Sequence, residues 1–450
     1  MKRSFVLLTL GLSIVISSYG QKKVLTFQDA VKIALQNGVL LNQQKNNLRL
    51  SEIQRTGAYL GLGPTITASG LAQQVEGNYF NQNEGRVING TTDRVQGSIT
   101  ANLTLFNGLN QLNTARAFSS ALDAQSYYVN RTAQDIINAI SLQYLTVLMD
   151  AELLTIAQQN HEVLKKQLEQ VNAQVELGSK SPVDGYNQSS QAKAAEIRAL
   201  EAEIKLLNDK ALLTQTLLMD PNEEFDVAKP DWDINASGSE ESELQALFDT
   251  ALKSRGDYLR AKKMEQSARY NMKAAWAGMT PTISAFAALG SGYNKSHGDI
   301  DARPFDLQFK TDNLQKAYGI QIYIPILGGN QVFQNRTFHV QQKVNYLNNQ
   351  ILTKNTEIQV KTDVQRTYQN FKLYKRTFSA SVDQLQAADM AFSLEKERYE
   401  LGVTSFVDFI TANKNLVQAQ TDRAQAEYRL LFQKVLMDYA TGTLKPEDLN

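Results

Sequence analysis

Two aspartates are the strongest candidates for chemistry in this sequence because they occupy equivalent places in a repeated motif. The pattern Leu-Gly-x-x-Ser-x-Val-Asp spans residues 177–184 and occurs again at residues 401–408. A Ser followed three residues later by an acid is typical of a capping box, and Gly suits the left-handed end of the preceding helix. The motif therefore predicts two helix–turn–helix connections in which Asp184 and Asp408 either cap a helix or place negative charge at the turn.

The remaining residue inventory argues against catalysis and against a bound metal or cofactor. The sequence has no Cys, and His161, His297 and His339 stand apart from other ligands at helical or strand spacing. Neither a phosphate-binding Gly-rich loop nor a nucleophile elbow occurs. Because 46 Lys and Arg balance 46 Asp and Glu, no basic excess is available to bind nucleic acid. We therefore expect no enzyme activity, no catalytic, metal-binding or cofactor-binding residues, and no nucleic-acid partner.

The first residues have the pattern of a secretory signal peptide. A basic start is followed by a largely apolar stretch at residues 5–16 and by the small residues Ser18 and Gly20. A membrane-spanning helix would need about 20 apolar residues, and no later run of that kind occurs. We therefore expect residues 1–20 to be removed, and any passage through a membrane to use a closed β-barrel.

Collinear matches indicate that the chain is an internal two-fold repeat. Residues 64–68 (PTITA) recur as residues 281–285 (PTISA) at an offset of 217, and the turn motif recurs at an offset of 224. Offsets that grow slowly along the chain are typical of a duplicated unit with small loop insertions. The expected organisation is a first repeat at 21–220, a linker near mid-height at 221–240, for which an ordinary surface loop is an equal alternative, and a second repeat at 241–450.

Each repeat is expected to hold a helix, a strand pair, a long helix and a second helix, in that order. Apolar and polar residues alternate at residues 98–105 and 320–326, which predicts strands, and the long Pro-free stretches keep a coiled-coil spacing. Polar loops are expected between the strands, at 76–93 and 293–314. The expected elements are a helix from about 27 to 60, strands at 64–75 and 94–106, a long helix at 108–177 and a helix at 184–219, then a helix after 241, strands at 281–292 and 315–327, a long helix at 330–401 and a helix at 408–440.

The expected fold class is a mixed α/β membrane protein in which several chains share one β-barrel. Four strands are too few to close a barrel alone, since about eight are needed for a filled interior. One apolar and one polar strand face suit lipid outside and water inside. A soluble periplasmic coiled-coil adaptor or structural protein is the alternative. It explains the long helices but leaves the amphipathic strands without a role.

The order of the elements and several local motifs resemble the TolC-type outer membrane efflux proteins. The resemblance covers residues 24–442 and includes the opening LTFxxAxxxALxN at 25–37, the Pro-x-Ile strand starts and the two turn motifs. It implies a homotrimer with a β-barrel in the lipid of the outer membrane and a periplasmic α-barrel. It also implies docking to a periplasmic adaptor, or membrane fusion protein, and to an inner-membrane transporter. Such a channel exports small molecules or proteins as the exit duct of a tripartite efflux or type I secretion system.

The same resemblance assigns roles to residues at the two turns. By position, Asp408 corresponds to an aspartate that rings the periplasmic entrance, Tyr399 to a gate tyrosine, and Asp184 lies on the partner helix. Thr411 stands where a second ring aspartate is expected, and Thr404 where an arginine of the latch is expected. The candidate adaptor contacts at the tips are Leu177, Gly178, Ser181, Leu401, Gly402 and Ser405.

Overall fold

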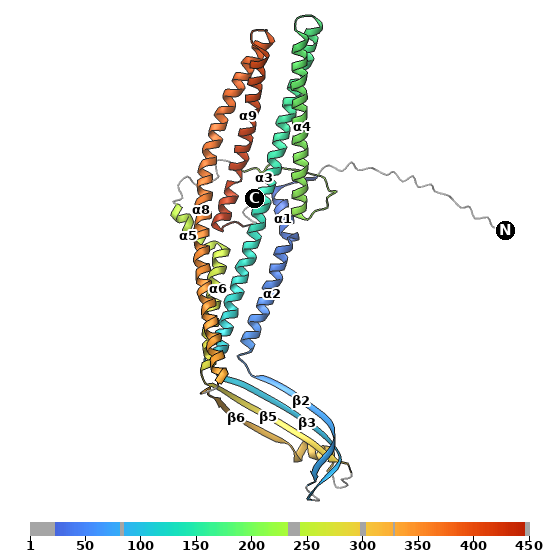
Figure 1. Cartoon of the computed structure of the whole chain (residues 1–450), viewed down its shortest axis with the longest axis vertical. Coiled ribbons are helices and arrows are strands. Elements are labelled where there is room, and N and C mark those ends of the chain that lie inside the picture. Colours follow the sequence, from blue (N-terminus) through green and yellow to red (C-terminus); the bar gives the residue numbers. More distant parts are fainter. Residues whose placement is uncertain (1–22, 82–84, 233–243, 298–302, 327–328, 446–450) are drawn as a thin grey trace, which may run out of the picture.

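The computed structural model describes residues 23–81, 85–232, 244–297, 303–326 and 329–445. The expected signal peptide at 1–20 and residues 233–240 of the expected linker lie outside the described residues. The molecule is elongated, with a four-stranded sheet at one end and two helical hairpins at the other (Figure 1).

The sheet is antiparallel throughout, with the strand order β2-β3-β5-β6. Its strands are β2 (Thr65–Asn81), β3 (Arg86–Phe106), β5 (Thr282–Ser296) and β6 (Gln315–Tyr323). Because β2 and β3 remain paired as far as Asn81 and Arg86, the prediction of a loop at 76–93 was wrong. At this end of the ribbon, the adjacent residues Tyr79 and Phe80 point to opposite faces, as do Val87 and Ile88, so the alternation from which a strand is recognised is lost.

The prediction of a continuous loop at 293–314 was also wrong. Strand β5 continues to Ser296, and α7 (Phe305–Leu307) leads into a π-helical turn, η2 (Gln308–Asp312). The amide of Gln308 accepts the Asn294 N–H at 3.1 Å and donates to the Asn294 carbonyl at 3.2 Å. The Gln308 side chain thus hydrogen-bonds to the part of β5 that extends beyond its pairing with β6. Strand β6 ends at Tyr323, before the predicted limit of 327.

Two long helices run from the sheet to the far end of the molecule (Figure 1). They are α3 (Asn110–Glu176, 67 residues) and α8 (Gly329–Glu400, 72 residues). At 1.5 Å per residue each is about 100 Å long. Two shorter helices pack along each of them, α2 (Val39–Leu60) and α4 (Pro182–Leu217) on α3, and α6 (Gly256–Trp276) and α9 (Phe406–Leu431) on α8.

Short elements gather at mid-height, where the shorter helices end (Figure 1). They are β1 (Lys23–Leu25), α1 (Phe27–Asn37), β4 (Phe225–Val227), α5 (Leu244–Ser254) and α10 (Gln433–Thr441). The predicted single helices at 27–60 and 408–440 are therefore each two helices. The first breaks at Gly38, where a Cβ atom would lie 2.7 Å from the Ala34 carbonyl oxygen, and the second breaks at Phe432.

A buried aromatic cluster joins these short elements to α3. Phe27 makes edge contacts with Tyr144, Trp232 and Phe432 at centroid distances of 5.2 to 5.5 Å. The Tyr144 hydroxyl lies 2.7 Å from the carbonyl oxygens of Leu25 and Ala228, and it accepts the Ala228 N–H at 3.1 Å. Burial raises the pKa of Tyr144, so the phenol stays protonated and continues to tie the parallel β1–β4 pair to α3.

By length and composition alone, α3 contains a window apolar enough to cross a membrane. The fully buried residues Ile137, Ile140 and Val147 belong to the mid-height core with α1, α4 and α9. Core packing accounts for part of this apolar content, since 44% of the window is buried.

Candidate functional site

The two motif turns lie side by side at the end of the molecule farthest from the sheet. One joins α3 to α4 and the other joins α8 to α9, and both point away from the strands (Figure 1). All six predicted tip residues and Asp184, Tyr399 and Asp408 lie in or next to these turns. The duplicated sequence motif therefore corresponds to two equivalent places at one end of the fold.

The first turn forms because Gly178 adopts a left-handed conformation, with φ of 71°. The Ser179 N–H then donates to the Gln174 carbonyl at 2.8 Å, which closes the end of α3. At the start of α4, the Ser181 hydroxyl accepts the Val183 N–H and the Asp184 carboxylate accepts the Ser181 N–H, both at 3.2 Å. This reciprocal capping box confirms the local geometry predicted from the motif.

The second turn repeats this geometry around Gly402, whose φ is 73°. The Ser405 hydroxyl accepts the Asp408 N–H at 3.2 Å and donates to the Asp408 carboxylate at 2.6 Å, and Thr404 donates to the same carboxylate at 3.3 Å. The Ser405 hydroxyl is the main reason that the pKa of Asp408 lies below its usual value. Because Asp408 is exposed, it presents a stable negative charge at the tip while it caps α9.

Tyr399 belongs to a small core that joins the two hairpins. Its side chain is 4% exposed and stacks on Phe409 at a centroid distance of 4.9 Å. The same core contains Leu164 of α3 and Ala192 and Ala195 of α4. Tyr399 therefore holds the two hairpins together within one chain, whatever its position in an assembly.

Lys180 is a further member of this site that the sequence analysis missed. Its ammonium nitrogen lies 3.8 Å from the centroid of the Tyr399 ring, so the first turn contacts the end of α8 directly. An ammonium over an aromatic face is attracted by the negative potential of the ring. No local pattern marks Lys180, because its partner lies in the other repeat.

The residues where the resemblance led us to expect further latch side chains bond within their own hairpin. Thr404 helps to cap α9 through Asp408, and the Thr411 hydroxyl donates to the Val407 carbonyl at 2.7 Å. Arg398 forms an ion pair with Glu395 of the same helix at 2.7 Å. In the described part of the chain, the contact between Lys180 and Tyr399 is the side-chain interaction that links the first turn to α8.

Apolar side chains cover the outermost surface of both turns. Leu177 is 83% exposed and its equivalent Leu401 is 73% exposed. Val183 and its equivalent Val407 are also exposed, at the start of the helix that follows each turn. Large apolar side chains that are this accessible at two equivalent places favour contact with another protein.

Within the described residues, no group of three or more His, Asp or Glu side chains lies close enough to hold a metal ion. The polar atoms of the site are instead used in caps and in contacts between hairpins. The two turns therefore present negative charge at Asp408 together with an exposed apolar surface to which another protein can bind.

At the opposite end of the molecule, the two faces of the sheet differ in polarity. Thr67 and Thr100 form a hydroxyl pair at 2.7 Å, and Ser69 and Ser98 form another at 2.8 Å on the same face. The opposite face carries exposed apolar residues on each strand, including Ile66, Ile99, Leu289 and Ile320. Such a division is typical of a strand set between lipid and water.

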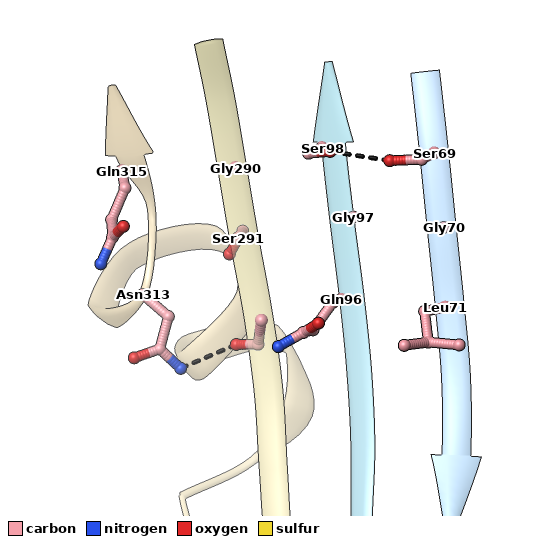
Figure 2. Close-up of a pocket in the computed structure, with 11 residues that line it drawn as sticks. Ser69, Gly70, Leu71, Gln96, Gly97, Ser98, Gly290, Ser291, Asn313 and Gln315 are labelled. Carbon is pink, nitrogen blue, oxygen red and sulfur yellow. Dashed lines mark hydrogen bonds between the residues drawn. The ribbon is translucent and has the colours of Figure 1, made fainter. Parts of the chain in front are cut away.

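The polar face is hollowed where glycines replace side chains. A cavity of about 570 Å³ is bordered by Ser98, Gln96 and Gln315, and Gly290 places no side chain in it (Figure 2). Every group that borders it is uncharged. The polar face of the sheet therefore offers space and neutral hydrogen-bonding groups to water and small solutes.

Known proteins match both the sequence and the fold. The family model described as "Outer membrane efflux protein" matches residues 247–443. The outer membrane efflux protein BepC of Brucella suis is 23% identical over 434 residues, covering 95% of this chain and 89% of its own. The outer membrane protein TolC of Escherichia coli is 22% identical over 417 residues, covering 89% of this chain and 80% of its own.

The solved structure of the outer membrane protein VceC of Vibrio cholerae superposes with a TM-score of 0.79 at 15% identity, covering 92% of this chain and 96% of the other. The likeness therefore extends over the sheet, the mid-height elements and the helical hairpins. Together with the matches in sequence, it shows that this chain belongs to the outer membrane efflux protein family of TolC-type channels.

Proposed function

We propose that three copies of this chain close into one continuous channel that serves as the exit duct of a tripartite efflux or type I secretion system. Proteins of this family generally form trimers within tripartite pumps. The observation that carries the proposal is that, among the described residues, both lateral edges of one chain are unpaired, in the sheet and in the helices alike. Strands β2 and β6 are the outer strands of the sheet.

The helical part has the same two edges. Helices α2 and α4 pack on α3 at one edge, and α8 forms the other. Exposed apolar residues follow a helical spacing along both, at Leu50, Ile53 and Leu60 of α2, at Ile197, Leu200, Ile204 and Leu207 of α4, and at Val344, Leu347, Ile351 and Ile358 of α8. A single chain buries none of these stripes, whereas a neighbouring copy would cover them by coiled-coil packing.

In this assembly the sheets form a shared barrel with the apolar face toward outer membrane lipid and the polar face toward water. The helices continue the barrel as a periplasmic tunnel, and the two turns form its entrance. Asp408 then contributes one carboxylate per copy to a ring, and negative potential in a narrow pore favours cations. Asp184 lies on the partner helix, α4. Tyr399 helps to close the entrance because its side chain packs between the two hairpins.

The exposed tips dock to the periplasmic adaptor that connects the channel to an inner-membrane transporter. Leu177 and Leu401 provide the apolar contact, and the turns at Gly178, Ser181, Gly402 and Ser405 set its shape. The export of small molecules or proteins follows from this position, because a duct without a catalytic site passes what its pump delivers. The two repeats, at 21–220 and 241–450, each supply one strand pair and one hairpin.

The test measures the mass of the detergent-solubilised protein by light scattering, with the detergent subtracted, together with its single-channel conductance. A trimer with discrete conductance steps supports the proposal. A monomer or dimer that is soluble without detergent would favour the alternative, a periplasmic coiled-coil adaptor or structural protein.

A further inference from the structure

We propose that a cavity at mid-height binds a small anion, namely a carboxylate or phosphate monoester attached to a compact apolar group. The cavity has a volume of about 650 Å³ and lies among α3, α6, α8 and α10 of one chain. It is separate from the helix turns and from the hollow in the sheet. This inference goes beyond the channel function and does not depend on how many copies assemble.

The group that selects an anion is the guanidinium of Arg260. It lies over the Tyr128 ring, with the central carbon 3.8 Å from the ring centroid. No carboxylate in the described part of the chain lies within ion-pair distance of Arg260. Stacking uses the face of the guanidinium and leaves its N–H edge available, and this edge matches the two oxygens of a carboxylate or phosphate.

A second arginine borders the cavity, but protein groups already occupy it. Arg131 pairs with Asp135 at 2.9 Å and lies over the Tyr439 ring at 4.1 Å. The Tyr439 hydroxyl also donates to Asp135, at 2.8 Å. This carboxylate is therefore neutralised within the wall and does not compete for Arg260.

The other carboxylate at the cavity is also neutralised. Both oxygens of Asp257 accept from the Arg255 Nε at 3.1 Å, and the buried Arg255 reaches Asp363 at 2.8 Å as well. With Asp135 and Asp257 both paired, Arg260 is the one charge at the cavity that the described residues leave uncompensated. The electrostatic preference is therefore for a single negative group.

The remaining lining defines the rest of the ligand. Met264 and Leu352 provide an apolar wall, and Asn349 and Gln359 of α8 add amide groups. The volume lies within the range of about 300 to 1,000 Å³ that is usual for small-molecule sites. A compact aromatic or aliphatic body can therefore lie against Met264 while its anionic group meets Arg260.

The test uses the purified full-length protein in nanodiscs and four probes of similar size. Phenyl phosphate and benzoate are the anions, benzylamine is the cation and benzyl alcohol is the neutral probe. Saturable binding of both anions at one site per chain, detected by calorimetry and ligand-observed NMR, is the expected result. Arg260→Gln should weaken it at least about tenfold, because a charge-assisted hydrogen-bonded pair is lost.

Arg269→Gln is the matched control, since Arg269 is exposed on the same helix outside the cavity. It should bind both anions as the unaltered protein does. Equal binding of all four probes, an unchanged affinity in Arg260→Gln, or no saturable anion binding would each overturn the proposal. Conductance and oligomeric mass measured on the same samples keep this outcome distinct from a failure of the channel proposal.

Discussion

The ammonium of Lys180 lies 3.8 Å from the centroid of the Tyr399 ring, and this contact joins the turn of the first repeat to the long helix of the second. The stack of Tyr399 on Phe409 continues the link into α9. The two hairpins at the proposed entrance are therefore coupled within one chain before any neighbouring copy contributes.

Lys180→Met should loosen this coupling. The substitution removes the charge and keeps a similar apolar length, at a cost of about 0.5 to 1 kcal/mol for a cation–π pair at an exposed site. In planar bilayers we expect the fraction of time in the open state to rise about two- to fivefold. Lys166→Met is the control, at an exposed position on α3 where the lysine pairs with Glu162 of the same helix. Equal open fractions in the two variants would show that the contact does not restrain the entrance.

Asp408→Asn should weaken the block of the pore by multivalent cations. The amide keeps the size of the side chain and can still accept at the cap, whereas the ring of negative charge is lost. Because the Ser405 hydroxyl lowers the pKa of Asp408, block of the unaltered channel should persist to a lower pH than an ordinary aspartate would allow. The measurement is the blocking concentration of a trivalent cation. Asp184→Asn, in the equivalent cap, is the comparison, and an unchanged block in Asp408→Asn would show that Asp408 serves only as a helix cap.

The Asp150–Asp209 pair between α3 and α4 should make stability depend on pH. Asp150 is buried and pairs with Lys205 at 2.5 Å, and its hydrogen bond with Asp209 raises the pKa of Asp209 to about 6. The folded chain therefore holds this proton more tightly than the unfolded chain, in which the pKa has its ordinary value of 3.8. The resulting stabilisation is complete below about pH 4 and is lost as the pH rises through about 6.

Thermal unfolding of the detergent-solubilised protein between about pH 4 and 8 tests this dependence. The midpoint of the unaltered protein should fall relative to that of Asp209→Asn up to about pH 6, since the amide is neutral at every pH. Above about pH 7 the two curves should run parallel. Parallel curves over the whole range would mean that the two aspartates do not share a proton.

Ile204→Glu should disrupt the proposed assembly without unfolding the chain. Ile204 is 60% exposed on the apolar stripe of α4, so a charge there costs little in one chain but is buried against a neighbouring copy. We expect the mass of the solubilised protein to shift from trimer toward monomer, with helix content unchanged. Arg198→Glu, exposed on another face of α4, should leave the trimer intact. A stable trimer of Ile204→Glu would mean that α4 does not face its neighbour.

Local sequence patterns predicted those parts of the fold that depend on residues close together in the sequence. The alternation at 98–105 marks β3, and the Ser-x-x-Asp spacing predicts the caps at Ser181 and Ser405, because each depends on residues only a few positions apart. The contact of Lys180 with Tyr399 could not be predicted in this way, since the chain folds back through a whole repeat to form it.

Two further features have no periodic signal. The ribbon at 76–93 has adjacent apolar residues on opposite faces, at Tyr79 and Phe80 and at Val87 and Ile88, and the Gln308 amide bonds to β5 through a single side chain. The breaks at Gly38 and Phe432 were missed for a related reason. The residues that flank both breaks retain helical composition, and Phe432 is fully buried in the mid-height core.

The parallel pairing of β1 with β4 has a consequence for how the chain is built during secretion. Lys23 pairs with Phe225, so the beginning of the first repeat contacts its end. The Tyr144 hydroxyl, in the middle of the same repeat, lies within hydrogen-bond distance of the carbonyls of Leu25 in β1 and of Ala228 next to β4. The first repeat can thus close on itself while the second is still being translocated. Phe432, near the carboxyl end, then packs against Phe27 and Trp232, so the last part of the chain to arrive completes a core that the first part has already started.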